Sequence, residues 1–232
     1  MKIKRFSFEK LNRMIRTNLF PEQEIPQDKE QKIIDDFHKL FYEQRGFDTK
    51  WMGTEMGKYA SDLLMYQEII YDTKPDVIIE CGTDKGGSAL FFAHLFDLLG
   101  KGEVITIDID DKNPPQHKRI THLVGKSTSK EIVEKVKERV QGKRIMVILD
   151  SDHDKGNVLK ELKAYYNLVS KGCYLIVEDS NVNGHPVYKN FGPGPFEAVE
   201  EFLKGNNDFK IDRSCERFLI TTNPNGYLRR VK

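Results

Sequence analysis

The sequence contains only three cysteines, Cys81, Cys173 and Cys215, and they lie far apart in the chain. An odd number without close pairs does not fit a disulfide framework or a zinc site. Cys81 and Cys173 lie inside apolar runs, which favours small, buried hydrophobic side chains. We therefore expect a reducing, cytoplasmic setting.

Long apolar runs and an excess of one charge are also missing. No stretch approaches the length of a membrane-spanning helix, and no apolar signal core follows the basic N-terminal residues. The 37 basic and 36 acidic residues leave a formal charge of +1, and neither sign forms a long block. The sequence therefore predicts no membrane span and no general affinity for nucleic acid or membrane surfaces.

Segments typical of strands alternate with segments typical of helices from residue 77 onward. The expected strands are residues 77–81, 103–107, 120–124, 145–149 and 174–177, and the expected helices are 88–99, 130–140, 157–169 and 196–203. This alternation predicts an α/β fold with a mostly parallel sheet and helices on both faces. Two further expected strands, 209–211 and 217–221, follow each other closely, which predicts an antiparallel hairpin at one edge.

The region before residue 51 departs from this pattern. Apolar residues recur at helical spacing between Ile33 and Phe41, after a segment broken by prolines. We expect residues 1–50 to form an N-terminal helical cap or lid and residues 51–232 to form the main domain. A homo-oligomer is expected if the N-terminal helix packs across subunits.

Two of the expected strands end abruptly in acidic residues. Residues 148–153 read Ile-Leu-Asp-Ser-Asp-His, and residues 176–179 read Ile-Val-Glu-Asp. Ligands of parallel sheets bind at the carboxyl ends of the strands, and clustered carboxylates suit Mg²⁺ or a similar divalent cation. We therefore predict a metal site made by Asp150, Glu178 and Asp179. His153 beside them is a further ligand, a general base, or a surface histidine without a role.

A glycine-rich turn joins the first expected strand to the helix that follows. It runs from Glu80 to Ser88 and includes Gly82 and Gly86, where the backbone can approach a ligand closely and the helix start offers free N–H groups. The spacing lacks both the GxGxxG dinucleotide pattern and the ending of a phosphate loop. Taken alone, the segment is either a ligand-binding loop or a plain tight turn.

An acid also ends the second expected strand, where Asp108 precedes Ile109-Asp110-Asp111. An acid at this point can accept hydrogen bonds from a ribose diol, and a solvated acidic turn is the alternative. Together with the glycine-rich turn, Asp108 favours an adenosine-containing cofactor. A long polar loop, residues 181–195, follows the second acidic strand end, and loops of this length in compact domains are often functional.

Together these motifs resemble the cephalosporin hydroxylase / rhamnosyl O-methyltransferase family. The similarity covers residues 78–83, 86–88, 107–110, 149–153, 177–179, 183–186, 192–195 and 226–230, and thus extends roughly from residue 51 to the C-terminus. It implies a Rossmann-like class I methyltransferase fold with S-adenosylmethionine as cofactor. It also implies Mg²⁺-dependent methylation of a hydroxyl on a sugar or natural-product-like small molecule.

The resemblance also implies roles for individual residues. The expected cofactor contacts are Glu80, Gly82, Thr83, Gly86, Ser88, Asp108, Ser127 and Asp150, with Asp108 at the ribose and Ser127 near the adenine. Asp150, Glu178 and Asp179 would hold Mg²⁺, and the catalytic pair would be His153, as the base, and Asp150.

Two other classes of function fit the same architecture. The first is a nicotinamide-dependent oxidoreductase or hydroxylase-type enzyme. The glycine spacing and Glu80 argue against the oxidoreductase, and the missing triad of two histidines and one carboxylate argues against the hydroxylase. The second is a non-catalytic nucleoside-binding protein, against which the complete carboxylate set argues.

Overall fold

A seven-stranded sheet forms the centre of the computed structural model, which describes residues 26–45 and 49–232. Its strands are β3 (Val77–Cys81), β4 (Glu103–Asp108), β5 (Ile120–Val124), β6 (Ile145–Leu149), β7 (Tyr174–Val177), β8 (Phe209–Ile211) and β9 (Tyr227–Arg230). They lie in the order β5-β4-β3-β6-β7-β9-β8. The first five are parallel to one another, whereas β9 runs antiparallel to both β7 and β8.

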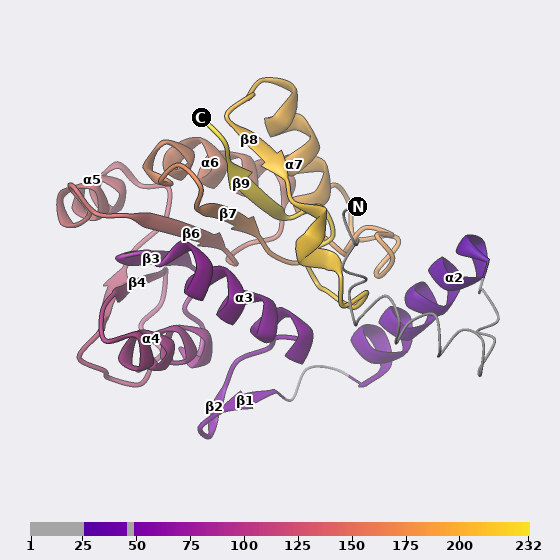
Figure 1. Cartoon of the computed structure of the whole chain (residues 1–232), viewed down its shortest axis with the longest axis horizontal. Coiled ribbons are helices and arrows are strands. Elements are labelled where there is room, and N and C mark those ends of the chain that lie inside the picture. Colours follow the sequence, from indigo (N-terminus) through magenta and orange to yellow (C-terminus); the bar gives the residue numbers. More distant parts are fainter. Residues whose placement is uncertain (1–25, 46–48) are drawn as a thin grey trace, which may run out of the picture.

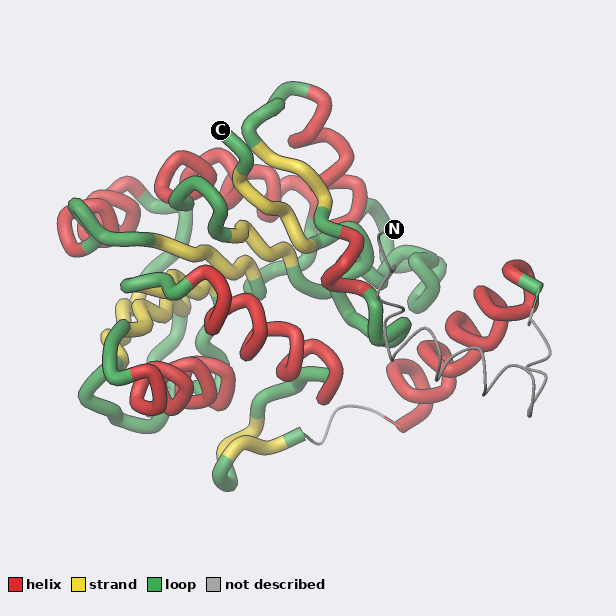
Figure 2. Tube along the Cα trace, in the orientation of Figure 1, coloured by secondary structure: helices red, strands yellow, loops and turns green. Residues whose placement is uncertain are grey.

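Helices cover both faces of this sheet (Figures 1 and 2). They are α3 (Ala60–Thr73), α4 (Gly87–Leu99), α5 (Lys130–Arg139), α6 (Lys155–Tyr165) and α7 (Pro195–Lys204). A short separate ribbon, β1 (Lys50–Trp51) with β2 (Thr54–Glu55), precedes α3. The architecture confirms the predicted α/β fold with an antiparallel edge.

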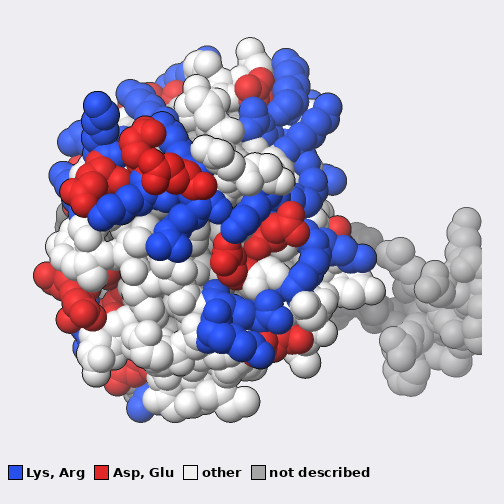
Figure 3. All heavy atoms as spheres, turned by 90° about the vertical axis from the view of Figure 1, so that its left-hand side faces the viewer, with Lys and Arg blue, Asp and Glu red and all other residues white. Residues whose placement is uncertain are grey.

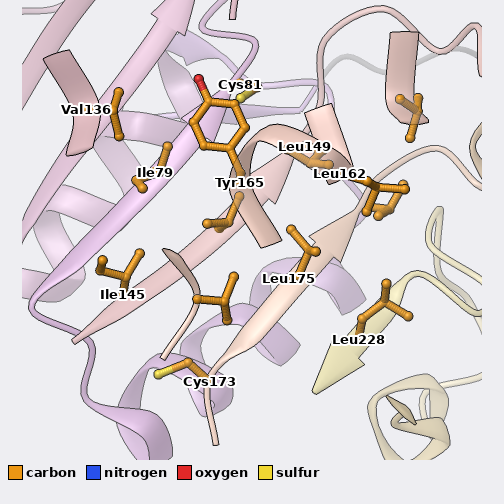
Figure 4. Close-up of a cluster of buried hydrophobic side chains, with 14 of the residues drawn as sticks. Ile79, Cys81, Val136, Ile145, Leu149, Leu162, Tyr165, Cys173, Leu175 and Leu228 are labelled. Atoms are coloured by element: carbon orange, nitrogen blue, oxygen red, sulfur yellow. The ribbon is translucent and has the colours of Figure 1, made fainter. Parts of the chain in front are cut away.

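The core is divided between the two faces because successive side chains of a strand point to opposite sides of a sheet. Ile79, Cys81 and Leu149 pack with α5, α6 and α7, as Figure 4 shows for part of this cluster. Their neighbours Ile78 and Ile148 pack with α3 and α4 on the other face. Burial on both faces explains why these strands read as continuous apolar runs.

The strand expected at residues 217–221 is wrong. A 3-10 helix (Arg213–Glu216) and turns occupy this region, and Phe218 and Leu219 are exposed. The antiparallel partner of β8 is instead β9, which also pairs with β7 through Tyr227 and Leu228, both fully buried.

The N-terminal part of the described chain is a helix, α2 (Gln27–His38), which continues as a π-helix, η1 (Lys39–Arg45). It lies to one side of the sheet, away from α4 and α5 (Figure 1). The part of the predicted cap before residue 26 lies outside the described residues. None of the helices in residues 26–45 and 49–232 combines the length and apolarity needed to cross a bilayer.

Charged side chains of both signs are interspersed on the face of the molecule drawn in Figure 3. This mixture agrees with the near-equal numbers of basic and acidic residues in the chain. No single-sign field covers that face.

Candidate functional site

The carboxyl ends of β4, β3 and β6 open into a cavity of about 570 Å³. It is lined by Gly82, Asp84, Ile107, Asp108, Ile109, Lys112, Gly125, Lys126, Ser127, Asp150, Ser151, Asp152 and Asn157. Parallel strands deliver the residues that follow them to one edge of the sheet. The size and position of the cavity suit a nucleoside-sized ligand. Four predicted cofactor residues, Gly82, Asp108, Ser127 and Asp150, line it.

Gly82 lies where the ends of β3 and β6 approach most closely. Its φ is +103°, and a Cβ placed on it would lie 1.8 Å from the backbone oxygen of Asp150. Only glycine tolerates this φ without strain, and only glycine leaves room for that oxygen. The predicted role of close backbone approach therefore has a physical basis here, although the close partner is Asp150.

Asp108 ends β4 and holds the glycine-rich turn in place. Its Oδ2 accepts hydrogen bonds from the backbone N–H groups of Thr83 and Asp84, at 3.0 and 2.9 Å, and Oδ1 accepts one from Asp110. Burial disfavours the charge on Asp108, but these three N–H groups together lower its pKa. An ionised carboxylate is thus fixed in the cavity wall, where it can accept further hydrogen bonds from hydroxyl groups.

Four predicted cofactor residues, Glu80, Thr83, Gly86 and Ser88, are absent from the cavity lining. Glu80 is fully buried, and its Oε2 accepts a 2.6 Å hydrogen bond from the Thr106 hydroxyl, which is 2.7 Å from that of Thr83. Burial raises the pKa of Glu80 to about 7, although the hydroxyls of Ser88 and Thr106 oppose the shift. In this structure these residues support the turn from behind.

A second cluster, of Asp150, His153 and Asp179, lies next to the cavity. Each residue offers one ligand atom, and these atoms lie within 4.8 Å of one another. His153 Nε2 is 3.1 Å from Asp179 Oδ2. Burial disfavours the charged imidazole, but Asp179, Asp150 and Glu178 outweigh burial and raise the pKa of His153 to about 9. Two carboxylates and an imidazole are a donor set suited to a hard or borderline divalent cation.

Glu178 lies outside this cluster and contacts a buried lysine. Lys58 Nζ is 2.6 Å from Glu178 Oε2 and 2.7 Å from Asp150 Oδ2, and only 2% of the Lys58 side chain is exposed. Burial disfavours the charge on Lys58, but the two carboxylates hold its pKa well above the usual value. Burial and Asp150 raise the pKa of Glu178, which also accepts a 2.7 Å hydrogen bond from Tyr66.

Asp179 has a strained backbone that distant residues hold in place. Its φ is +51°, a left-handed value that costs free energy in residues other than glycine. Its N–H donates to Asn223 Oδ1 at 3.2 Å, and its Oδ1 accepts a 3.1 Å hydrogen bond from the Tyr42 hydroxyl. Burial works against the charge, but His153 and the other partners lower the pKa of Asp179.

The N-terminal segment and the loop of residues 181–195 meet at this cluster. The ring of Tyr42 packs edge-on against that of Tyr188, with 5.3 Å between centroids. Glu43 accepts a 2.8 Å hydrogen bond from the backbone N–H of Tyr188. His185 instead lies against α7, where it stacks on Phe196 and contacts Glu197.

Four residues at the site were not predicted from the sequence: Tyr42, Lys58, Tyr66 and Asn223. None belongs to a recognisable motif, and each comes from a segment far in sequence from the acidic strand ends. Tyr66 lies within α3, and aromatic residues at helical spacing usually belong to the core. Only the fold brings these side chains to Glu178 and Asp179.

Known proteins with similar sequences are methyltransferases. The chain is 40% identical over 209 residues to a rhamnosyl O-methyltransferase of Mycobacterium tuberculosis, with 85% of each chain covered. It is 39% identical over 208 residues to the rhamnosyl O-methyltransferase of Mycobacterium leprae, covering 85% of this chain and 90% of that protein.

Solved structures of CmcI have a similar fold. An apo structure of CmcI matches with a TM-score of 0.62 and 25% identity, covering 80% of this chain and 77% of that one. A structure described as a complex of CmcI with Mg and SAM matches with a TM-score of 0.61 and 24% identity, covering 80% and 78%. This similarity confirms the predicted Rossmann-like methyltransferase fold.

The model of the family described as "Rhamnosyl O-methyltransferase/CmcI" matches residues 43–231. The match spans most of the chain and includes both acidic strand ends and the glycine-rich turn. The predicted family and the predicted enzyme class, an S-adenosylmethionine-dependent O-methyltransferase, are thereby confirmed. The chain belongs to the rhamnosyl O-methyltransferase/CmcI family.

Proposed function

We propose that this chain transfers the methyl group of S-adenosylmethionine to a hydroxyl of a sugar or sugar-bearing small molecule, with the help of Mg²⁺ or a similar divalent cation. One observation carries the proposal: Asp150 belongs both to the wall of the nucleoside-sized cavity and to the cluster with His153 and Asp179. A methyl donor in the cavity and a hydroxyl at the cluster would therefore be neighbours. The rhamnosyl O-methyltransferases at about 40% identity support a sugar as the acceptor.

The donor set fits a divalent cation. Asp150 and Asp179 present carboxylate oxygens close together, and Glu178, outside that cluster, shares the Lys58 ammonium with Asp150. Asp150, Glu178 and Asp179 would hold the cation. A divalent cation bound there lowers the pKa of an acceptor hydroxyl and orients it. It also disfavours a positive charge on the neighbouring imidazole.

His153 would act as the general base. Its Nε2 lies at the cluster, where it would take the proton of the acceptor hydroxyl as the new O–CH₃ bond forms and the S–CH₃ bond breaks. Asp108 and Gly82 would place the adenosyl part of the donor, and S-adenosylhomocysteine would be released. Holding both reactants in line contributes much of the rate, because the reaction then resembles an intramolecular one.

Residues 26–45 would form one wall of the acceptor site, opposite the loop of residues 181–195. The support is the contact of Tyr42 with both Asp179 and Tyr188. In this role the N-terminal segment is the lid that the sequence predicts.

Transfer of label from S-adenosylmethionine carrying a labelled methyl group to a panel of rhamnosides and other glycosides tests this function. EDTA should abolish transfer, and Mg²⁺ should restore it. Asp150→Asn and His153→Ala should each lower turnover at least about 100-fold, which is the usual loss when a general base is removed. Both variants should still bind S-adenosylhomocysteine in calorimetric titrations. His122→Ala, a histidine variant on β5, serves as the matched control and should keep turnover.

The roles of the residues are separable in the same experiment. His153→Ala should keep cation affinity within about threefold, because the base is not a ligand, whereas Asp150→Asn should lose most of it. Loss of cation affinity in His153→Ala would make His153 a ligand. Full turnover in EDTA, or in both variants, would contradict the proposed mechanism.

A further inference from the structure

Glu161 is a buried carboxylate directly behind the end of the cavity formed by Ser127 and Ser151. It comes from α6 and is fully buried. Its Oε1 accepts hydrogen bonds from both serine hydroxyls, 2.5 Å from Ser127 Oγ and 2.6 Å from Ser151 Oγ. A carboxylate only accepts hydrogen bonds, so both hydroxyl protons point away from the cavity.

The same end of the cavity is fixed by further bonds. The Tyr165 hydroxyl, also from α6, donates to the backbone oxygen of Ser127 at 2.6 Å. The Asn157 amide nitrogen donates to Ser151 Oγ at 3.2 Å and to the backbone oxygen of Asp152 at 3.3 Å, which leaves the amide oxygen of Asn157 to face other groups. Ser127 and Asn157 therefore present hydrogen-bond acceptors to the cavity.

The walls between this end and Asp108 are apolar. Ile107 and Ile109 line the cavity, and 68% of the Ile109 side chain is exposed. The same cavity therefore combines an apolar surface for a flat ring with the acceptors of Ser127 and Asn157. Lys126 is the charged donor on the same stretch, and its side chain is exposed to water.

Glu161 keeps its arrangement at a cost. Its second oxygen, Oε2, is buried and has no hydrogen-bond partner within the part of the chain that the structure describes. A buried polar atom without a partner costs free energy of folding, and such an atom calls for an explanation. One explanation is that the buried carboxylate of Glu161 orients the two serine hydroxyls beside the bound ligand.

We propose that Glu161 is a positioning residue that sets base selectivity: by holding the protons of Ser127 and Ser151, it makes this end of the cavity accept a 6-aminopurine and reject a 6-oxopurine. Adenine carries a donor amino group at position 6, which pairs with the acceptors. Hypoxanthine carries an acceptor oxygen there, which would oppose them. The inference rests on the proposed use of an adenosyl cofactor.

Calorimetric titration with S-adenosylhomocysteine and S-inosylhomocysteine, whose bases differ at position 6 and in the hydrogen that hypoxanthine carries on N1, tests the proposal. The wild-type protein should bind the adenosyl compound about tenfold to 100-fold more tightly, the usual effect of leaving buried acceptors unpaired. Glu161→Leu should reduce this ratio to within about threefold, because a side chain without an acceptor leaves the protons of Ser127 and Ser151 free to turn into the cavity.

Ser127→Ala tests the same inference with Glu161 left intact, in case Glu161→Leu does not fold. It should weaken binding of the adenosyl compound about tenfold and leave the inosyl compound unchanged. Lys126→Met tests whether this lysine sets the ratio instead, and Lys130→Met, an exposed residue at the start of α5 outside the cavity lining, is the matched control and should preserve the wild-type ratio. Thermal melting in the absence of ligand reports whether each variant is folded.

Equal binding of both compounds to the wild type would overturn this inference and leave the proposed function standing. A wild-type ratio in folded Glu161→Leu or in folded Ser127→Ala would also overturn it. A ratio that collapses in Lys126→Met but not in Ser127→Ala would assign selectivity to the lysine and also overturn it. If the wild type binds neither compound, the proposed function fails, and this inference fails with it.

Discussion

Replacing Lys58 by methionine should strongly destabilise the protein when divalent cations are removed. The Lys58 ammonium is buried between two carboxylates, 2.7 Å from Asp150 and 2.6 Å from Glu178. Methionine fills a similar volume but leaves both carboxylates without their counter-charge. Removing one member of a buried ion pair costs about 3–5 kcal/mol, because the remaining charge is uncompensated. In a chain of this size, that loss lowers the melting temperature by roughly 6–20 °C.

A divalent cation should partly reverse this effect. With Lys58 absent, Asp150 and Glu178 lose their counter-charge, so a cation gains more from binding the folded variant than from binding the folded wild type. Ligands that bind only the folded state raise its stability in proportion to the logarithm of concentration over Kd. The melting temperature of Lys58→Met should therefore rise more on adding Mg²⁺ than that of the wild type.

Scanning calorimetry in EDTA and in Mg²⁺ measures both quantities. Lys101→Met is the matched control, because Lys101 also pairs with an aspartate, Asp76, but both side chains are about half exposed. Exposed pairs contribute about 0–1 kcal/mol, so this variant should melt close to the wild type. The reasoning is refuted if Lys58→Met is as stable as Lys101→Met in EDTA, or if Mg²⁺ stabilises Lys58→Met no more than the wild type.

Three further variants test other features of the site. Gly82→Ala should lose about 3 kcal/mol of free energy of unfolding, because its Cβ would lie 1.8 Å from the Asp150 backbone oxygen at a φ of +103°. Urea denaturation measures this loss, and a variant as stable as the wild type would refute the close approach. Asn223→Ala should lower the free energy of unfolding by about 1–3 kcal/mol and weaken cation binding, because the backbone N–H of Asp179 loses its acceptor. Unchanged cation affinity in calorimetry would contradict the view that Asn223 holds Asp179 in place. Glu197 has a pKa lowered to about 2: burial opposes its charge, but Gly194, Asn183 and His185 outweigh burial. A lowered pKa stabilises the fold above the usual value of 4.5, and this stabilisation is lost as the pH falls toward 2. The stability difference between the wild type and Glu197→Gln should therefore shrink between pH 5 and pH 3 in chemical denaturation, and a constant difference would contradict it.

The sheet could be predicted from the sequence because its signals are local. Runs such as residues 77–81 and 145–149 are apolar throughout, and each is followed by a helix of the expected length. The error at residues 217–221 shows the limit of such signals. Thr221 and Thr222 are buried, but Thr222 donates to Asp62 instead of pairing in the sheet. A local apolar run does not show that the polar residues beside it form hydrogen bonds with another part of the fold.

The candidate site was predictable only where its residues follow strands. Asp108, Asp150 and Asp179 follow β4, β6 and β7 as expected, because parallel strands end at one edge. Adjacent residues, however, can face opposite sides: Glu178 contacts Lys58, and Asp179 contacts His153. Glu161 and Asn223 were out of reach, because they act through tertiary contacts that no spacing encodes.

If both neighbouring sites are occupied as we propose, a single carboxylate, that of Asp150, contacts two ligands. It lines the nucleoside-sized cavity and also belongs to the cluster with His153 and Asp179. Thermodynamic reciprocity requires that, if cation binding changes the affinity for the nucleoside by some factor, nucleoside binding changes the affinity for the cation by the same factor. The affinities for the cation and for the nucleoside would then be coupled through one shared side chain. The order in which the two ligands bind would follow from their cellular concentrations.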